Sequence, residues 1–338
     1  MNKDIGWKGY LADNDRYADI INGICCNGRQ MVAGSDLKEL DTQTGFLRKP
    51  LFAGTNSSKG TKNFKKSDRR IKIRDTIRKA AFGVNFAIIG IENQEIIDYS
   101  MPLRIMSYDA GEYEKQAAKI RREIRKGHKG LSASEYLYGF AKENRLHPVI
   151  TLIIYSGEDE WSGYESLHEM IDFTDIPETM INMVQDYRVN LVEIRKLTDT
   201  SVFQTDVRQV FDFIRCSGDK EALRNLVENN DAYKSMEEDA YDVVAQYTNA
   251  TELIEAKDDY CGKDGKVDMC KALKELIEDG RAEGREEGRE EGIEQGLRAL
   301  VLSLSLLLPS LDAVHQAVIR NEDYKNVSKE QIKKYYKR

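Results

Sequence analysis

The stretch IKIRDTIRKAAFGVNFAIIGIENQ, residues 71–94, carries the pattern that decides the fold. Apolar and basic residues alternate up to Asp75, which is typical of a strand with one apolar face. Gly83 is the expected turn, and residues 86–91 form an apolar run with the length of a buried strand. We therefore predict two neighbouring strands, with Asp75 on the first and Glu92 at the end of the second.

Three polar residues, Glu92, Asn93 and Gln94, end this apolar run. Because side chains two positions apart share one face of a strand, we expect Glu92 and Gln94 to point together and Asn93 to point away. A neighbouring strand would set Asp75 beside Glu92, and two converging carboxylates repel unless a cation lies between them. Mg²⁺ is a hard ion that takes one or two carboxylates and meets a substrate phosphate. The pattern predicts a site for Mg²⁺, or for Mn²⁺ in its place; the alternative is a hydrated strand end.

The rest of the chain alternates helical and strand patterns before it becomes helical. Apolar residues or helix-forming composition indicate helices within residues 14–28 and 103–127, and buried strands are expected within 147–157 and 187–197. From about residue 205 onward the pattern is helical. Strands interspersed with helices predict an α/β domain, here followed by a helical region.

The charge of the chain argues against a protein that coats nucleic acid, but it allows a local basic site. The 338 residues carry a formal net charge of −7, yet the field in a groove depends on where the charges lie. Two basic clusters, one around the first strand and one on helix 103–127, are expected to hold a phosphate backbone. The residues expected to bind nucleic acid are Lys72, Arg74, Arg78, Lys79, Arg121, Arg122 and Arg125. The alternative for the first cluster is a solvated edge strand guarded by lysines.

Four segments of the sequence together carry a resemblance to a known protein family. They are RYADIINGICCNGRQ (16–30), RRIKIRDTIRKAAFGVNFAIIGIENQEIIDYSMPLRIMSYDAGEYEKQ (69–116), HPVITLIIYSGEDEWSGYESL (147–167) and the Gly-Arg-Glu-Glu tail. In this order they resemble the recombination-promoting nuclease and transposase family of the PD-(D/E)XK nuclease superfamily. Asp75 followed by Glu92-Asn93-Gln94 is similar to the acidic pattern of that superfamily, with glutamine where lysine is usual.

The resemblance implies a restriction-endonuclease-like core, a mixed central sheet flanked by helices, and a metal-dependent DNA endonuclease linked to recombination or mobile elements. By this resemblance, Asp75 and Glu92 would bind Mg²⁺, the carbonyl of Asn93 would complete the protein ligands, and Gln94 would hold the attacking water. Because glutamine carries no positive charge, it can orient water but stabilises less of the charge that develops on phosphate.

Three further residues are expected to support this site. Asp19 would lie near the metal, behind its direct ligands. Tyr113 and Gln116 lie about one turn apart on helix 103–127 and are expected to touch the site.

The domain organisation expected from these patterns has three parts. A nuclease-like domain covers residues 10–200, a helical region covers 201–279, and a Gly/Arg/Glu repeat with a helical tail covers 280–338.

The repeat places glycine at every fourth position from Gly280 to Gly296. Each exposed glycine costs a helix about 1 kcal/mol, so the segment is either flexible or packed closely against a partner helix. Apolar residues follow at near-helical spacing: Leu297, Leu300, Val301, Leu304 and Leu308. We expect them to pair with a second copy, which makes a homo-oligomer through residues 270–320. A solvated linker is the alternative.

The remaining composition points to a cytoplasmic protein without a membrane span. The chain has five cysteines and no CxxC motif, which favours free thiols in a reducing compartment. Its longest apolar stretch, near residue 305, is too short to cross a bilayer. The function expected is therefore a Mg²⁺-dependent DNA endonuclease, and the alternative is an inactive DNA-binding or assembly protein that retains the fold.

Overall fold

The computed structural model describes residues 3–45, 71–73, 75–83, 85–127, 130–247 and 251–336. The chain divides into two compact units, Met1–Met269 and Cys270–Arg338. The first is mixed α/β and the second is helical. Among the helices in these ranges, none combines the length and the apolar composition needed to cross a lipid bilayer.

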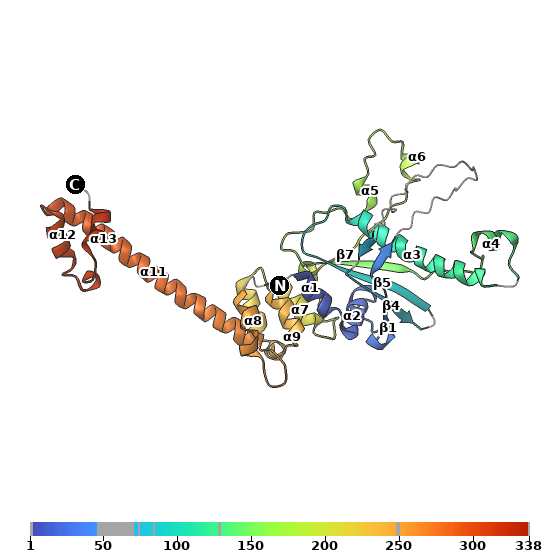
Figure 1. Ribbon diagram of the computed structural model, residues 1–338, viewed down its shortest axis with the longest axis horizontal. Coiled ribbons are helices and arrows are strands. Elements are labelled where there is room, and N and C mark those ends of the chain that lie inside the picture. Colours follow the sequence, from blue (N-terminus) through green and yellow to red (C-terminus); the bar gives the residue numbers. More distant parts are fainter. Residues whose placement is uncertain are drawn as a thin grey trace, which may run out of the picture. The chain divides into compact units, whose positions relative to one another are not determined.

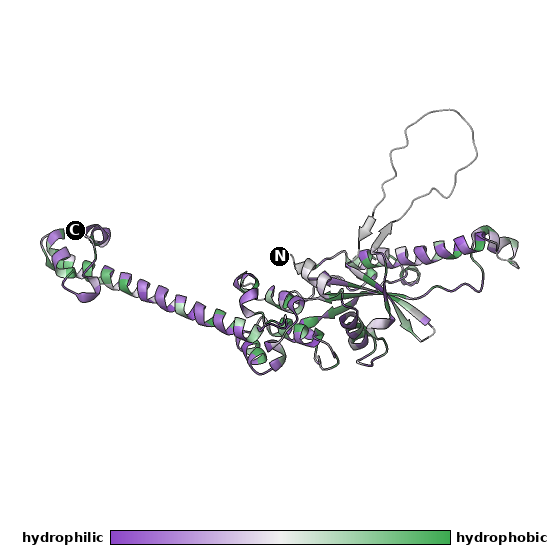
Figure 2. Cartoon of the chain, turned by 60° about the horizontal axis from the view of Figure 1, so that its bottom comes forward, coloured by the Kyte–Doolittle hydropathy of each residue, from purple (hydrophilic) through white to green (hydrophobic). Residues whose placement is uncertain are grey.

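A five-stranded mixed sheet forms the centre of the first unit (Figure 1). In spatial order its strands are β1 (Leu37–Glu39), β4 (Thr76–Phe82), β5 (Asn85–Gln94), β6 (Val149–Tyr155) and β7 (Asn190–Glu193). Strands β1, β4 and β5 pair antiparallel, whereas β5, β6 and β7 pair parallel. Much of the sheet is green in Figure 2 because its own strand residues are apolar, as expected of strands that are covered on both faces.

The second predicted strand is confirmed as β5, whereas the prediction of one first strand that carries Asp75 is wrong, because β4 begins only at Thr76. Residues Ile71–Ile73 form β3, which pairs with β2 (Gln43–Gly45) in a separate two-stranded sheet. Asp75 lies in a bend directly before β4. Gly83 makes the turn to β5 with a φ of +63°, a conformation that favours glycine because it has no Cβ.

Helix α3 (Met101–Arg125) connects β5 to the parallel strand β6 and covers one face of the sheet. Pro102 fits the first turn, where its missing N–H is not needed, and basic residues in the last turn suit the negative end of the helix dipole. Its N-terminal half buries Met101 and Ile105 against Ile153 and Tyr155 of β6. The first half of α3 is thereby held over the sheet.

Helices from both ends of the first unit cover the other face. Helix α1 (Lys3–Tyr10) packs on α9 (Glu238–Ala245), and α2 (Asn14–Ile20) packs on α7 (Val207–Cys216). The hydroxyl of Tyr17 donates to the carbonyl oxygen of Ile89 over 2.8 Å, which ties α2 to β5. The shorter helices are α4 (Ala133–Tyr138), α5 (Leu167–Met170), α6 (Glu178–Ile181), α8 (Lys220–Glu228) and α10 (Thr251–Glu255), and a π-helical turn, Ile21–Cys25, follows α2.

Residues 201–269 belong to the same compact unit as the sheet, and not to the separate helical region over 201–279 that the sequence predicted. The hydroxyl of Tyr247 donates to Ser156 Oγ over 2.6 Å and accepts from Trp7 Nε1 over 2.9 Å. These buried bonds join the end of β6 to helices that are about 240 residues apart in sequence.

The second unit contains most of α11 (Met269–Leu307), with α12 (Leu311–Val318) and α13 (Lys329–Tyr335). The glycine repeat is helical, and a Cβ added at Gly280, Gly284 or Gly288 would meet nothing within 4 Å. The residues expected to pair with a second copy instead pack inside the chain: Leu297 and Val301 join Val314, Val318 and Ile332 in one buried cluster, and Leu300, Leu304 and Leu308 lie against it. That part of the oligomer prediction is wrong, because α12 and α13 fold back onto these positions.

Candidate functional site

The structure brings Asp75 and Glu92 together at the end of the β4–β5 pair. The antiparallel register pairs Thr76 with Ile91, so one step further places Asp75 opposite Glu92. The backbone N–H of Asp75 donates to Glu92 Oε1 over 3.2 Å, and the N–H of Asn93 donates to Asp75 Oδ2 over 3.2 Å. Glu92 therefore accepts from the backbone of Asp75, and Asp75 accepts from the residue that follows Glu92. These two hydrogen bonds hold the carboxylates close together.

Arg104 on α3 balances the charge of Glu92, whose side chain is fully buried. The Nη2 of Arg104 lies 3.0 Å from Glu92 Oε2, and the Nη1 of Arg104 lies 3.1 Å from Asp98 Oδ2. The Nε of Arg104 also donates to the hydroxyl of Tyr108 over 3.1 Å. A buried carboxylate is costly unless it is paired and hydrogen-bonded, and Arg104 meets that requirement.

Ionisation of the groups around Glu92 reflects this cluster. Burial works to lower the pKa of Arg104, but the hydrogen bond to Tyr108 and the charge of Glu92 outweigh it and raise that pKa above its usual value. Burial and the charge of Glu92 raise the pKa of Tyr108, and Asp75 adds to the effect. Burial acts to raise the pKa of Asp98, but hydrogen bonds from Ser100 and Arg104 lower it overall. Arg104 thus stays charged and Tyr108 stays neutral at neutral pH.

Lys8 supplies a second cation, this time from α1. Its Nζ lies 3.7 Å from Asp75 Oδ1, and its side chain is 47% exposed. Sequence patterns alone did not reveal Lys8, Arg104 or Tyr108, because these residues come from elements that only the fold brings to the carboxylates. Arg104 and Tyr108 did carry one signal: they lie four apart at the start of the helix that follows Glu92.

The side chains of Gln94 and Asn93 lie on opposite faces of the sheet, as expected for neighbouring residues of a strand. In the parallel register Glu92 and Gln94 pair with Ile153 and Tyr155, which face α3. Gln94 is half-buried on that face, whereas the Asn93 side chain lies on the other. The amide Nδ2 and Oδ1 of Asn93 are buried there, and neither has a hydrogen-bond partner among the described residues.

The carbonyl of Asn93 is turned to the same side as Asp75. Within a strand the N–H and C=O of one residue point toward the same neighbour, and the N–H of Asn93 reaches Asp75. The carbonyl of Gln94 faces the opposite way and accepts from the N–H of Ser156 over 2.9 Å. Two carboxylates and a backbone carbonyl therefore converge at this edge of the sheet, and all three offer the oxygen ligands that Mg²⁺ prefers.

The donor set fits a magnesium ion, with one condition. Both Glu92 oxygens already accept hydrogen bonds, one from the Asp75 backbone and one from Arg104. Arg104 uses one lone pair of Oε2 and brings a positive charge to it, so it would compete there with a metal ion. In the described part of the chain, this edge of the sheet included, no group of three or more His, Cys, Asp or Glu side chains is placed to hold a metal ion.

Tyr113 and Gln116 lie at the other end of the sheet. The hydroxyl of Tyr113 accepts from the N–H of Val149, and Gln116 both accepts from the N–H of His147 over 2.7 Å and donates to its carbonyl over 3.1 Å. These bonds hold the first residues of β6, whereas Gln94 pairs with Tyr155 at its end. The expectation that they touch the metal site is not met, since α3 runs away from Glu92 along the sheet.

Asp19 has a different role from the one expected. Its carboxylate accepts from the N–H groups of Gln204 and Thr205 and from the Thr205 hydroxyl, at 2.6 to 2.9 Å. These bonds hold the loop that leads into α7, whereas Asp19 was expected to support a metal ligand.

The basic residues near the first strand divide between the two faces of the sheet. Arg78 is 3% exposed, stacks on the Tyr17 ring at 5.1 Å and donates to Asn14 Oδ1 over 3.2 Å. It is therefore withdrawn from any surface that a phosphate could reach. Lys79 is half-buried and lines a cleft beside α3. Arg74 and the side chain of Lys72 lie outside the described parts of the chain.

The basic residues near the end of α3 remain accessible. Arg122 and Arg125 are exposed, and Arg121 is 40% exposed with its Nη1 3.3 Å from Glu114 Oε2. They lie near the C-terminal end of α3, several turns from the residues that contact Glu92.

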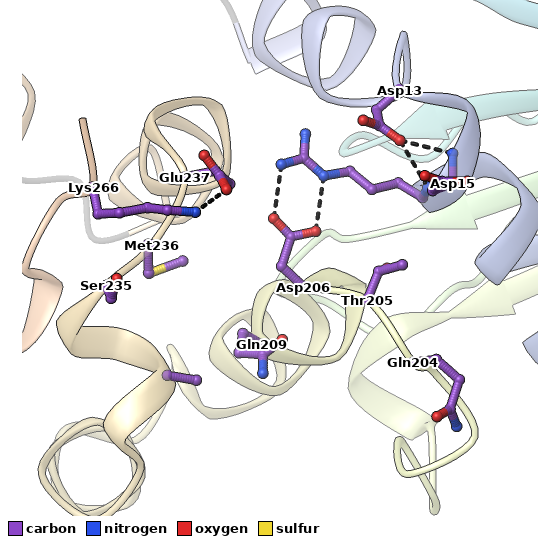
Figure 3. Close-up of a pocket in the computed structure, with 12 residues that line it drawn as sticks. Asp13, Asp15, Gln204, Thr205, Asp206, Gln209, Ser235, Met236, Glu237 and Lys266 are labelled. Carbon is purple, nitrogen blue, oxygen red and sulfur yellow. Dashed lines mark hydrogen bonds and ion pairs between the residues drawn. The ribbon is translucent and has the colours of Figure 1, made fainter. Parts of the chain in front are cut away.

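A polar cleft of about 450 Å³ lies away from Asp75 and Glu92, between α2, α7 and α9. In Figure 3, Asp206 faces a guanidinium group, that of Arg16, which also binds Asp239. Arg16 is 7% exposed, and every nitrogen of its guanidinium group donates to a protein oxygen. The cluster therefore stabilises the packing of these helices, and the charge of Arg16 is already balanced by Asp206 and Asp239.

Comparisons with known proteins found no match to a family model, to a curated protein or to a solved structure.

Proposed function

We propose that the protein is a Mg²⁺-dependent endonuclease that hydrolyses phosphodiester bonds in DNA, built on a restriction-endonuclease-like core as in the recombination-promoting nuclease and transposase family. One observation carries the proposal: Asp75 and Glu92 meet at the end of the paired strands β4 and β5, with Gln94 on the same face as Glu92.

The residues around the carboxylates have distinct roles in this proposal. Asp75, Glu92 and the carbonyl of Asn93 hold the metal, and the Gln94 amide orients the attacking water. When bound, Mg²⁺ supplies a water of lowered pKa and a charge that offsets the phosphate oxygens.

Lys8 compensates for the missing charge at position 94. A glutamine cannot offset the negative charge that develops on phosphate, but an ammonium group beside Asp75 can. Arg104 keeps the buried Glu92 carboxylate in place through a charge-assisted hydrogen bond.

One observation favours the second candidate, an inactive DNA-binding or assembly protein with the same fold. Arg104 bridges Glu92 and Asp98, so the cation that neutralises Glu92 is already part of the chain. A site that is permanently closed by this arginine would not bind a metal.

Nicking of supercoiled plasmid DNA separates the two candidates. We expect nicking in Mg²⁺ or Mn²⁺, none in EDTA, and none by the Asp75→Ala variant. Glu178→Ala, which removes an exposed carboxylate on α6, is the matched control and should nick at the parental rate. Metal-independent nicking, or nicking by Asp75→Ala at the parental rate, would contradict the endonuclease proposal.

A further inference from the structure

The region around the end of α3 and α4 is basic in a chain that is acidic overall. Residues 119–145 hold eight lysines and arginines against three glutamates, a formal charge of +5, whereas the whole chain carries −7. Arg122, Arg125 and Lys126 are exposed at the end of α3. Such a local excess of positive charge attracts polyanions even when the protein as a whole is negative.

Helix α4 presents large apolar side chains to solvent within this basic region. None of its residues is buried, and Tyr136, Leu137 and Tyr138 are 62%, 76% and 74% exposed. Figure 1 shows α4 beyond the strands, at the far end of α3. A helix this exposed gains little from packing, so its tyrosines are better explained by a ligand than by the core.

The chain nevertheless holds α4 in a defined conformation. Ser132 and Glu135 form a capping box, and Glu135 Oε1 also accepts from the N–H of Lys142 over 3.0 Å. These backbone hydrogen bonds lower the pKa of Glu135 to about 2, so Glu135 is ionised at neutral pH and keeps both hydrogen bonds. Gly139 ends the helix with a φ of +67°, where a Cβ would lie 3.0 Å from Arg121 Cγ. The tyrosines are thus displayed on a capped turn seated against α3.

Charge and aromatic character together identify the ligand. A second copy of this region would bring +5 against +5 in a symmetric contact, which repels. Unpaired nucleotides offer phosphates to the cations and flat bases to the tyrosine rings, and each stacked base contributes about 1–3 kcal/mol. Bases within a duplex are already stacked and do not offer their faces.

We propose that α4 and the end of α3 form a binding site for single-stranded or unpaired DNA. In this site Tyr136 and Tyr138 stack on bases, and Arg122, Arg125 and Lys126 contact phosphates. The choice of DNA as the nucleic acid rests on the proposed nuclease function, whereas the surface itself rests on charge and exposure.

Binding of a fluorescent oligonucleotide of about 20 nucleotides, followed by anisotropy in EDTA, tests the site without cleavage. We expect the Tyr136→Ala/Tyr138→Ala variant to bind the single strand at least about tenfold more weakly than the parental chain, with little change for the duplex. The Tyr136→Phe/Tyr138→Phe variant keeps both rings and should bind as the parental chain does. Thermal melting should be unchanged in both variants, because no α4 residue is buried.

The basic residues have a separate readout in the salt dependence of binding. Replacing Arg122 and Arg125 by glutamine should lower the slope of log K against log salt by about 1.4, since each phosphate contact on a single strand contributes about 0.7. An unchanged slope would remove these two arginines from the site.

The proposal would be overturned if the alanine variant bound the single strand as tightly as the parental chain, or if the phenylalanine variant lost as much affinity as the alanine variant. It would also be overturned if the parental chain bound neither oligonucleotide, or if it bound phosphatidylserine vesicles more tightly than DNA. Plasmid nicking in Mg²⁺ keeps this result separate from the nuclease proposal. Tyrosine-dependent binding without nicking would reject the nuclease and keep the site, whereas Asp75-dependent nicking with tyrosine-independent binding would do the reverse.

Discussion

At the scale of single residues, the carboxylates at the sheet edge depend on cations from distant parts of the chain. Glu92 is fully buried and relies on Arg104 from α3, and Asp75 is reached by Lys8 from α1. Glu92 is the more constrained of the two, because a buried charge that loses its partner costs far more than an exposed one. Variants at these positions should therefore differ in stability as well as in activity.

Glu92→Ala should destabilise the metal-free protein by about 2 kcal/mol, because it removes the acceptor of the Asp75 N–H and one of the two acidic partners of Arg104. Urea unfolding in EDTA measures this loss. A double-mutant cycle of Glu92→Gln with Arg104→Gln gives the coupling between the two charges. If Glu92→Ala unfolds at the parental urea concentration, the ion pair contributes nothing to the fold.

Lys8→Gln should lower the nicking rate about tenfold, because it removes a positive charge beside Asp75, where the proposed function requires the reacting phosphate to bind. Its effect on the free energy of unfolding should stay within about 0.5 kcal/mol, since the pair with Asp75 is partly exposed. Lys38→Gln, an exposed lysine on β1, is the control and should leave the rate unchanged. An unaltered rate in Lys8→Gln would mean that Lys8 is only a surface partner of Asp75.

Gln94→Lys should nick at the parental rate or faster, because the added ammonium group would lie on the same face as Glu92 and near the developing charge. Initial rates in Mg²⁺ measure the effect, and anisotropy checks that DNA affinity is retained. A large loss of rate with unchanged affinity would show that the amide has a geometric role that lysine cannot fill. An unfolded variant would contradict the placement of Gln94 on the half-buried face.

At the scale of elements, α3 and α11 show how one helix can serve two environments. The first half of α3 buries apolar residues on the sheet and holds Arg104, whereas its end carries exposed arginines. In α11, the last turns pack on α12 and α13, whereas the glycine repeat is exposed. Because a run of exposed residues from 280 to 295 with a glycine at every fourth position has little helix propensity, the repeat is the weakest part of α11.

Replacing Gly284 and Gly288 by alanine should stabilise α11 by about 1 kcal/mol at each position, since both are helical and surrounded by open space. Gly296→Ala is the contrasting variant and should destabilise the second unit, because its Cβ would lie 2.3 Å from the Tyr324 hydroxyl. Helical ellipticity during thermal melting measures both effects. Loss of stability in the Gly284/Gly288 double variant would indicate a second helix packed closely along the repeat.

At the scale of the whole molecule, an endonuclease that cuts two strands benefits from two copies, so we keep the homo-oligomer through residues 270–320 as a prediction. The leucines after Gly296 are covered within the chain, but Leu306 and Leu307 are 87% and 78% exposed, and the glycine repeat is open. These surfaces remain for a second copy.

Truncation after Asp279 should convert a dimer into a monomer, because it removes the glycine repeat and the exposed leucines together. Light scattering of the full and truncated chains measures the mass of each. Nicking of both strands at one site should fall in parallel, whereas nicking of one strand should persist. Equal numbers of subunits before and after truncation would leave the second unit as a tether.

The sequence by itself determined the elements that lead to the carboxylates. Hydrophobic periodicity and local backbone preference predict the strands β5, β6 and β7, most of the long helix α3 and the turn at Gly83. They also predict that Glu92 and Gln94 share one face of their strand. These properties depend on neighbours within a few residues, so they can be recognised in one dimension. The proximity of Asp75 to Glu92 followed from the same reasoning, since one turn joins β5 to β4, which begins directly after Asp75.

Only the tertiary structure decided which side chains complete that edge of the sheet. Lys8 and Arg104 reach the carboxylates because α1 and α3 pack on opposite faces, and no local pattern encodes that meeting. Asp19 and Gln116 carry polar groups suited to a site, yet their partners lie 185 and 31 residues away and use them to hold a loop and a strand. Periodicity places a side chain on a face, but the partner of a polar group is chosen by long-range packing, where each buried donor and acceptor must be satisfied.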